Sequence, residues 1–156
     1  MQIVFSKGDP LSIFGTYGYN NEDDYGILGM DSHADVSCAG KDALIISRLE
    51  GRTCDVKRFH DSYGSISNVN YVNVLYKYSD NQAQEYLLEV NQALDFMTSM
   101  KNSILCTNQA RHNGVVIHDD SKIIDRSSPQ CILFPSHNVQ LPLAMRGPAV
   151  LQVWLG

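Results

Sequence analysis

Short apolar segments separated by polar turns begin at Gly26, and they constrain the possible fold of this chain more than any other feature. Segments of this kind are typical of a β-rich domain. We predict strands at 27–30, 43–48, 53–59, 70–78 and 85–91, followed by further strands within VVIHDD, KIID, CILFP, VQLPLAM and AVLQVWL. The pattern therefore predicts a mainly β fold.

The stretch from Asn70 to Asn91 alternates apolar and polar residues on both sides of the turn-forming segment SDNQAQ. Alternation in a strand places successive side chains on opposite faces. One face then carries Tyr71, Asn73, Leu75 and Lys77, and the other carries Val72, Val74, Tyr76 and Tyr78. We predict a β-hairpin here, and the pattern alone favours an ordinary meander hairpin over a mobile flap.

Helical structure is predicted in only two places. LLEVNQALDFMTSM offers a partial helical face, and SILCTNQARHNG has Ser103 as a capping residue and Gly114 as a stop signal. The 156 residues fit one domain with a substantial core. We divide the chain into an irregular lead-in (1–25), a core (26–117) and a β-rich C-terminal extension (118–156), whose abrupt apolar end is compatible with truncation.

Composition argues against several classes of function. The net charge is −5 and the 12 Lys and Arg residues are scattered, which argues against direct nucleic-acid binding. The sequence has no apolar run long enough for a membrane-spanning helix, and its first residues do not resemble a signal peptide. Cys38, Cys54, Cys106 and Cys131 are widely spaced, so we expect reduced thiols in an intracellular, cytoplasmic protein.

The stretch GILGMDSHADVSCAGKDALII concentrates chemically active residues at the end of a predicted strand. A carboxylate such as Asp31 at the end of a buried strand is partly shielded from water, so its proton affinity can be tuned. Ser32 can donate a hydrogen bond that holds this carboxylate in place. Taken alone, however, an Asp at a strand end is more often a turn former.

The wider stretch DSHADVSCAGKDALI resembles the aspartic protease region of copia-type retrotransposon polyproteins, in the subgroup that carries Asp-Ser-His-Ala-Asp at this place. Other segments agree with that family in order and spacing. They are GRTCDVKRF, NVNYVNVLYKY, EYLLEVNQALDF, SILCTNQARHNGVVIHDD and CILFPSHNVQLPLAMRG. The resemblance covers approximately residues 26–147.

This resemblance implies a retropepsin-like closed β-barrel with a flap hairpin, here Asn70–Asn91, and one or two short helices. It also implies a homodimer that cleaves peptide or polyprotein substrates, with Asp31 of each chain as the catalytic residue and Ser32 as its hydrogen-bonding neighbour. Neither metal nor cofactor is required in such an enzyme. The sequence contains one Asp-Ser-x-Ala motif, as a homodimer of this kind needs.

His33 departs from the family's commoner motif, which has Gly at this position because the backbone turns tightly there. Three interpretations stay open: a variation that preserves activity, an altered pH profile, or an inactive relic. We expect Asp35 to stabilise the following turn.

Two other functions compete with proteolysis. Asp31, His33 and Asp35 alternate along the chain and could bind a metal, with His118, Asp119 and Asp120 as further ligands. Metal-dependent phosphoesterases also need Gly-Asp and Asn-His segments, which this sequence lacks, so a metal-dependent hydrolase is the weaker alternative. The chain could instead be an inactive, retrotransposon-derived dimerisation or structural module.

Overall fold

A computed structural model describes residues 2–4, 26–57, 62, 64–146 and 150–154. Its strands are β1 (Gln2–Val4), β2 (Ile27–Asp31), β3 (Cys38–Ala39), β4 (Leu44–Lys57), β5 (Ser65–Ser79), β6 (Glu85–Asp95), β7 (Ser103–Cys106), β8 (Val116–His118), β9 (Cys131–Phe134), β10 (Val139–Pro142), β11 (Ala144–Arg146) and β12 (Val150–Trp154). The described helices are α2 (Thr107–His112) and the short 3-10 helix η2 (Pro135–His137). The predicted mainly β fold with short helices is confirmed.

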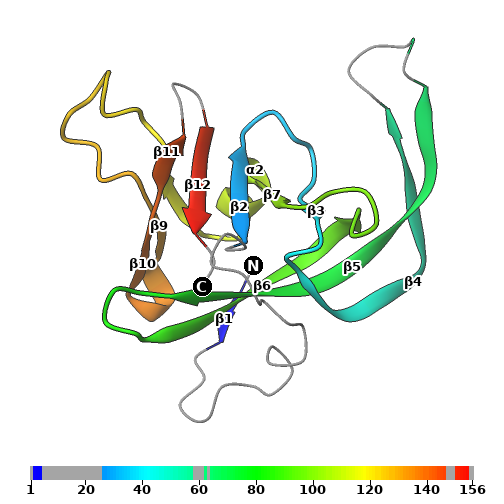
Figure 1. The fold of residues 1–156 in the computed structure, drawn as a ribbon, viewed down its shortest axis with the longest axis horizontal. Coiled ribbons are helices and arrows are strands. Elements are labelled where there is room, and N and C mark those ends of the chain that lie inside the picture. The colour runs from blue at the N-terminus through cyan, green and yellow to red at the C-terminus, as the bar shows by residue number, and fades with distance from the viewer. Residues whose placement is uncertain (1, 5–25, 58–61, 63, 147–149, 155–156) are drawn as a thin grey trace.

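Nine strands form one sheet in the order β11-β12-β2-β7-β3-β6-β5-β4, with β1 paired to β6 outside this path. The strands β10, β9 and β8 form a second, three-stranded sheet (Figure 1). Strand β2 lies between β12 and β7, and it runs parallel to β7. The expected closed barrel is not found among the described residues, because the strands at the two ends of this order, β11 and β4, do not pair with each other.

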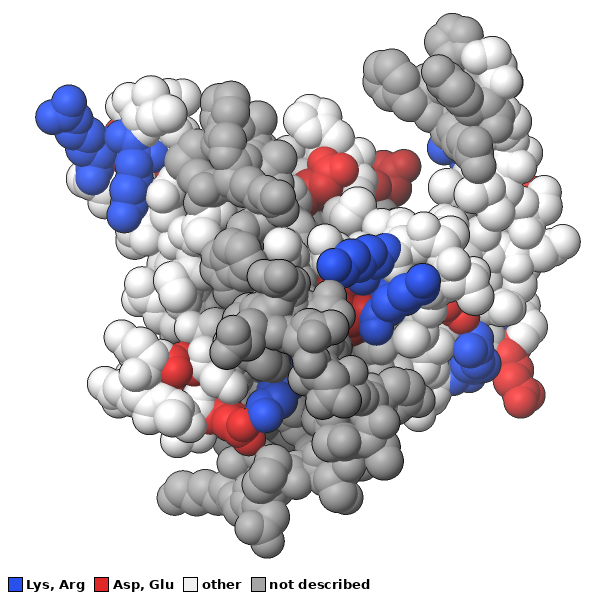
Figure 2. Space-filling view, in the orientation of Figure 1, with Lys and Arg blue, Asp and Glu red and all other residues white. Residues whose placement is uncertain are grey.

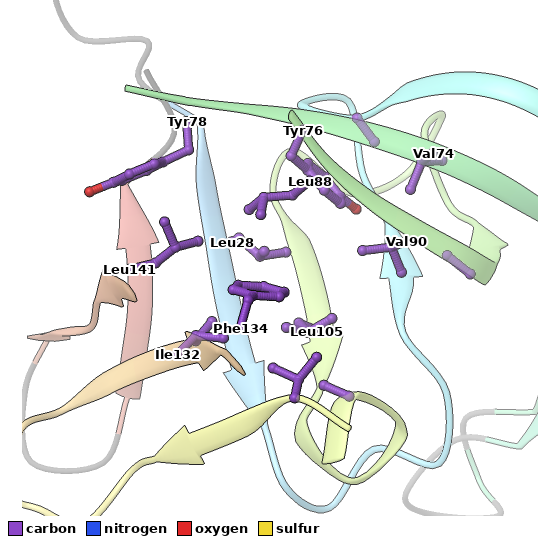
Figure 3. Packing of buried hydrophobic residues seen from close by; sticks show 14 of the residues in the cluster. Leu28, Val74, Tyr76, Tyr78, Leu88, Val90, Leu105, Ile132, Phe134 and Leu141 are labelled. Carbon is purple, nitrogen blue, oxygen red and sulfur yellow. The ribbon is translucent and has the colours of Figure 1, made fainter. Parts of the chain in front are cut away.

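The core lies between the large sheet and the three-stranded sheet (Figure 3). Its buried side chains come from strands of both sheets. They include Leu28, Val74, Tyr76, Leu88, Val90 and Leu105 from the large sheet and Ile132, Phe134 and Leu141 from the small one. The boundary that we predicted between residues 117 and 118 falls inside β8, and residues on both sides of it pack into this core.

The predicted hairpin at 70–91 is present as β5 and β6, which join through a turn at Asp80. Alternate residues of β5 are buried as expected, among them Val72, Val74, Tyr76 and Tyr78. We had assigned the role of a flap to this hairpin. That assignment is corrected here, because the buried face of the hairpin is part of the core. Its turn also lies at the lower left of Figure 1, away from the upper end of β2 that carries Asp31.

The hairpin that projects from the molecule is formed by β4 and β5 (Figure 1). We call residues 48–57 of β4 and 65–70 of β5 the arm. Most side chains of the arm are exposed, and Val69 is its one buried residue among those described. Strand β4 is continuous across the break that the sequence suggested at 49–52, where Gly51 adopts a φ of 71°.

Several local predictions were wrong because tertiary pairing overrides local preference. The stretch LLEVNQALD belongs to β6, where it pairs with β1, β3 and β5. Ser103 lies in β7, and the cap of α2 is Cys106, whose Sγ accepts a hydrogen bond from the Gln109 backbone N at 3.3 Å. KIID lies in turns, where Ile123 and Ile124 are exposed.

The lead-in assigned to 1–25 lies outside the described residues except for β1. Among the described residues, no helix is both long and apolar enough to cross a membrane. All four cysteines are free thiols, as predicted from their spacing.

Candidate functional site

Asp31 is the last residue of β2, an interior strand of the large sheet. It lies in register with Cys106 on the parallel neighbour β7. Its side chain keeps 45% of its surface exposed to solvent, although Leu28 on the same strand is fully buried. Asp31 thus lies at a strand end, as the sequence predicted, and about half of its side chain is shielded from water.

The carboxylate is oriented by the backbone of its own turn. The His33 backbone N donates a hydrogen bond to Asp31 Oδ1 at 2.8 Å. Ser32 does not make the predicted bond to the carboxylate, because its Oγ lies 3.2 Å from His33 Nδ1 instead. Ser32 therefore contacts the imidazole, and the main chain takes the orienting role that we had assigned to its hydroxyl.

His33 fits this turn without the conformation that glycine would supply. It is not among the described residues with a left-handed φ, so its β-carbon adds no backbone strain. The side chain is 95% exposed, and its Nδ1 lies 3.9 Å from Asp31 Oδ1. The imidazole is thus at the rim of the site.

Residues that follow Asp31 are fixed by side chains from β7 and α2. We call residues 32–37 the Asp31 loop. Cys106 Sγ donates to the Ala34 carbonyl at 2.9 Å, and Asn108 Nδ2 donates to the Ser32 carbonyl at 3.0 Å. A short loop whose carbonyls are bonded at Ser32 and Ala34 has little freedom to move, so these contacts hold the turn that carries Asp31.

Gln109 and Ser37 fix the far end of this loop. The amide oxygen of Gln109 accepts from the Ser37 backbone N at 3.0 Å and from Ser37 Oγ at 2.7 Å. Ser37 Oγ in turn accepts from the Cys106 backbone N at 3.0 Å. Ser37 is 2% exposed, so this network lies inside the protein, where its polar groups need such partners.

Sequence reasoning missed Ser37, Cys106, Asn108 and Gln109 as parts of the site. Nothing in their spacing marks them, because they approach Asp31 only when β7 pairs with β2. The one signal was the polar run TNQ directly after the apolar strand SILC, which places hydrogen-bonding side chains at the strand end.

Cys38 shares the environment of Asp31. Burial raises the pKa of the Cys38 thiol to about 11, with smaller contributions from Cys54, Asp31 and Cys106. The high pKa keeps the Cys38 thiol protonated at neutral pH, so it is not a nucleophile there.

Asp42 is a second partly buried acid, and its role is structural. It accepts hydrogen bonds from the backbone N and the Oγ of Ser103 at 3.1 and 2.5 Å. Burial raises the pKa of the Asp42 carboxyl, and the bonds from Ser103 lower it in part. Ser103 Oγ also accepts from the Gly40 backbone N at 2.8 Å, so this acid anchors the start of β7.

The metal-site alternative finds no ligand set in the described part of the chain, where no group of three or more His, Cys, Asp and Glu residues is placed to hold an ion. Asp35 is exposed, and no hydrogen bond links it to the turn that we expected it to stabilise. Asp119 is paired with Arg111 Nη2 at 2.8 Å. The candidate metal ligands that alternate in the sequence are therefore not placed together around one ion.

An open hollow separates the arm from the body of the protein, and acidic side chains lie on its body side (Figure 2). Strand pairing and alternation place Cys54, Val56, Ile66 and Val69 on one face of the arm. That face of the arm is therefore largely apolar.

Comparisons with models of protein families, with curated proteins and with solved structures found no match to this chain.

Proposed function

We propose that this chain is an aspartic endopeptidase that acts as a homodimer, with one Asp31 from each copy, and that it processes a polyprotein of the copia retrotransposon type. The observation that carries the proposal is the setting of Asp31. A half-exposed carboxylate ends an interior strand, and the loop after it is held by Cys106, Asn108 and Gln109. The resemblance of the DSHADVSCAGKDALI stretch supplies the reaction class.

The chemistry of such a pair follows from its charges. Two carboxylates about 3 Å apart cannot both ionise at low cost, so they share one proton. The ionised carboxylate takes a proton from water as the water oxygen attacks the peptide carbonyl carbon. The protonated carboxyl donates to the carbonyl oxygen. The C–N bond then breaks, the amine leaves with a proton, and the carboxylate pair returns to its shared-proton state.

The arm would cover a bound peptide in this enzyme. In this proposal the apolar face of the arm is turned toward the hollow, and an extended peptide lies between that face and the carboxylate pair, where closure of the hairpin excludes water. The arm also carries β4, the end strand of the large sheet, whose outer backbone groups are available for pairing with a peptide. This role replaces the flap that we had assigned to the β5–β6 hairpin.

His33 is the departure from the family's commoner motif, and its Nδ1 lies 3.9 Å from Asp31 Oδ1 at the rim of the site. Cleavage by His33→Gly, which restores that motif, compared with wild type at several pH values distinguishes the three interpretations of this residue.

The decisive experiment is a cleavage assay on a segment of the polyprotein that flanks the chain, at several pH values and with chelator present. Wild type is compared with Asp31→Asn, which keeps the shape of the side chain and removes its charge. We expect Asp31→Asn to lower kcat by at least about 10³-fold. Asp120→Asn, the same substitution at an exposed acid outside the site, is the matched control.

Mixing provides a further test of the dimer. Asp31→Asn chains added to wild type would form mixed dimers with one competent carboxylate, so activity should fall as the inactive chains are added. Sedimentation measures the assembly directly. A chain that stays monomeric, or activity that survives in Asp31→Asn, contradicts the proposal. A dimer that cleaves nothing would instead identify the inactive structural module.

A further inference from the structure

Asn73 lies in the middle of β5, opposite an irregularity in β4. Ile45 pairs with Val74 and Ser47 pairs with Asn73, so Ile46 is an extra residue in β4. A residue of this kind forms a β-bulge, which bends the strand and increases its twist. The arm begins just beyond this bulge, and both of its strands curve away from the body there (Figure 1).

Strand β6, which pairs with the other edge of β5, is also irregular opposite Asn73. Asn91 and Gln92 of β6 lie together opposite Asn73, which makes a second bulge. Gln92 has a φ of 62°, a left-handed conformation that is uncommon for a residue with a side chain. Asn73 is therefore flanked by a bulge on each side, at the base of the arm.

One amide side chain connects these two bulges. Asn73 Nδ2 donates to Ser47 Oγ on β4 at 2.9 Å, and Asn73 Oδ1 accepts from the Gln92 backbone N on β6 at 3.0 Å. An amide can donate and accept at once, whereas the Val and Leu residues around it in β5 have no hydrogen-bonding side-chain atoms. The bridge explains why Asn, a residue depleted in strands, occurs there.

Gln109 continues the connection from β6 to the Asp31 loop. Its Nε2 donates to the carbonyls of Asn91 at 3.2 Å and Gln92 at 3.4 Å. Its Oε1 accepts from Ser37, the last residue of the Asp31 loop. Hydrogen bonds thus run without a break from the base of the arm to the loop. We call this path the Asn73 link, and its members are Ser47, Asn73, Gln92, Gln109 and Ser37.

We propose that Asn73 is a positioning residue for the Asp31 loop, and that the Asn73 link makes the placement of this loop depend on the position of the arm. The catalytic meaning of this inference rests on the proposed function. A bulge can adopt more than one bend, and the amide bridge selects one bend for both strands. When the bridge is lost, Gln92 shifts, and Gln109 no longer holds Ser37 in one place.

Hydrogen exchange of the full chain tests the link without any need for activity. Asn73→Ala should speed exchange of the amides at 32–37 by about tenfold or more, although residue 73 does not touch that loop. Asn70→Ala is the matched control, because Asn70 is an exposed residue of the same strand outside the link. Amides of β9 report global unfolding and should be unchanged in both variants.

A second variant tests whether the link acts in series. Gln109→Glu keeps the oxygen that accepts from Ser37 and removes the donors to Asn91 and Gln92. It should speed exchange at 32–37 on its own, and combining it with Asn73→Ala should add less than the sum of the single effects, since both break one path. Full additivity, or faster exchange confined to β4–β6, overturns the inference, as does an equal effect of Asn70→Ala.

Cleavage kinetics add the catalytic readout. A displaced carboxylate slows chemistry more than binding, so Asn73→Ala should lower kcat by about tenfold while KM changes less than threefold. An unchanged kcat contradicts the positioning role. A wild-type chain that cleaves nothing refutes the proposed function instead, and the exchange experiment still decides whether the link exists.

Discussion

The Asp31 loop and the arm are built in opposite ways. The loop is held by side chains distant in sequence, such as Cys106 and Gln109, and its Ser37 is fully buried. The arm is held mostly by pairing between its own two strands, and its side chains are mostly exposed. A two-stranded hairpin with little buried surface is marginally stable by itself. The loop thus offers a fixed geometry, whereas the arm can change position at small cost.

The largest effect should come from removing core volume beneath the loop. Leu105→Ala, at a residue 1% exposed on the strand that supports Asp31, should lower the free energy of unfolding by about 2–5 kcal/mol. Thr53→Ala in the arm should change it by less than about 0.5 kcal/mol. Urea unfolding measures both. Equal losses would mean that the arm is as tightly packed as the body.

Gly40 in the body of the protein and Gly51 in the arm differ in the space around them, so alanine at each position tests how tightly each region is packed. A β-carbon on Gly40 would lie 2.7 Å from the backbone carbonyl of Asn102, which cannot rotate away, so Gly40→Ala should cost about 3 kcal/mol. Gly51 in the arm has open space around it and a φ of 71°. Gly51→Ala should therefore cost only the backbone strain, about 1 kcal/mol. Thermal unfolding would contradict the contrast if Gly51→Ala were the more damaging change.

The reactivity of Cys38 measures how well the protein around it excludes water, because burial raises the pKa of its thiol. A pKa of about 11, against an ordinary 9.0, reduces the thiolate at pH 8 by about 100-fold, so iodoacetamide should label Cys38 slowly until the pH nears 11. Because the folded pKa is the higher one, the unfolded chain ionises first. Stability should fall as the pH rises from 9 through 11, and Cys38→Ala should lessen this fall. A labelling midpoint near 9 would show that the region opens.

The smallest effect should come from the ion pair at the base of the arm. Arg48 Nη1 lies 2.7 Å from Asp95 Oδ2, and the Arg48 side chain is 56% exposed. Exposed pairs contribute about 0.2–1 kcal/mol and are screened by salt. Arg48→Ala should therefore lower the unfolding free energy by no more than this, and less in 1 M salt. A loss that does not depend on salt would indicate packing by the arginine stem instead.

The β class, the alternating faces of β5 and the place of Asp31 at a strand end were predictable from the sequence alone. These features depend on periodicity and on nearby residues, which a single stretch such as ILGMD contains in full. Turn chemistry was likewise local, so the 80–84 turn was predictable. The helix assigned to LLEVNQALDFMTSM failed, because its partial helical face was a local signal that three partner strands overrode.

Which hairpin projects, and which side chains hold the Asp31 loop, depended on contacts between residues far apart in the chain. The sequence gives no register between distant strands, and register is what places Cys106 beside Asp31 and puts Asn73 between bulges in β4 and β6. In the sequence, Asn73 was one of four residues on the same face of a predicted strand. Its partners, Ser47 and Gln92, become neighbours only when the strands pair, because hydrogen bonds act over a few ångströms of space whatever the separation along the chain.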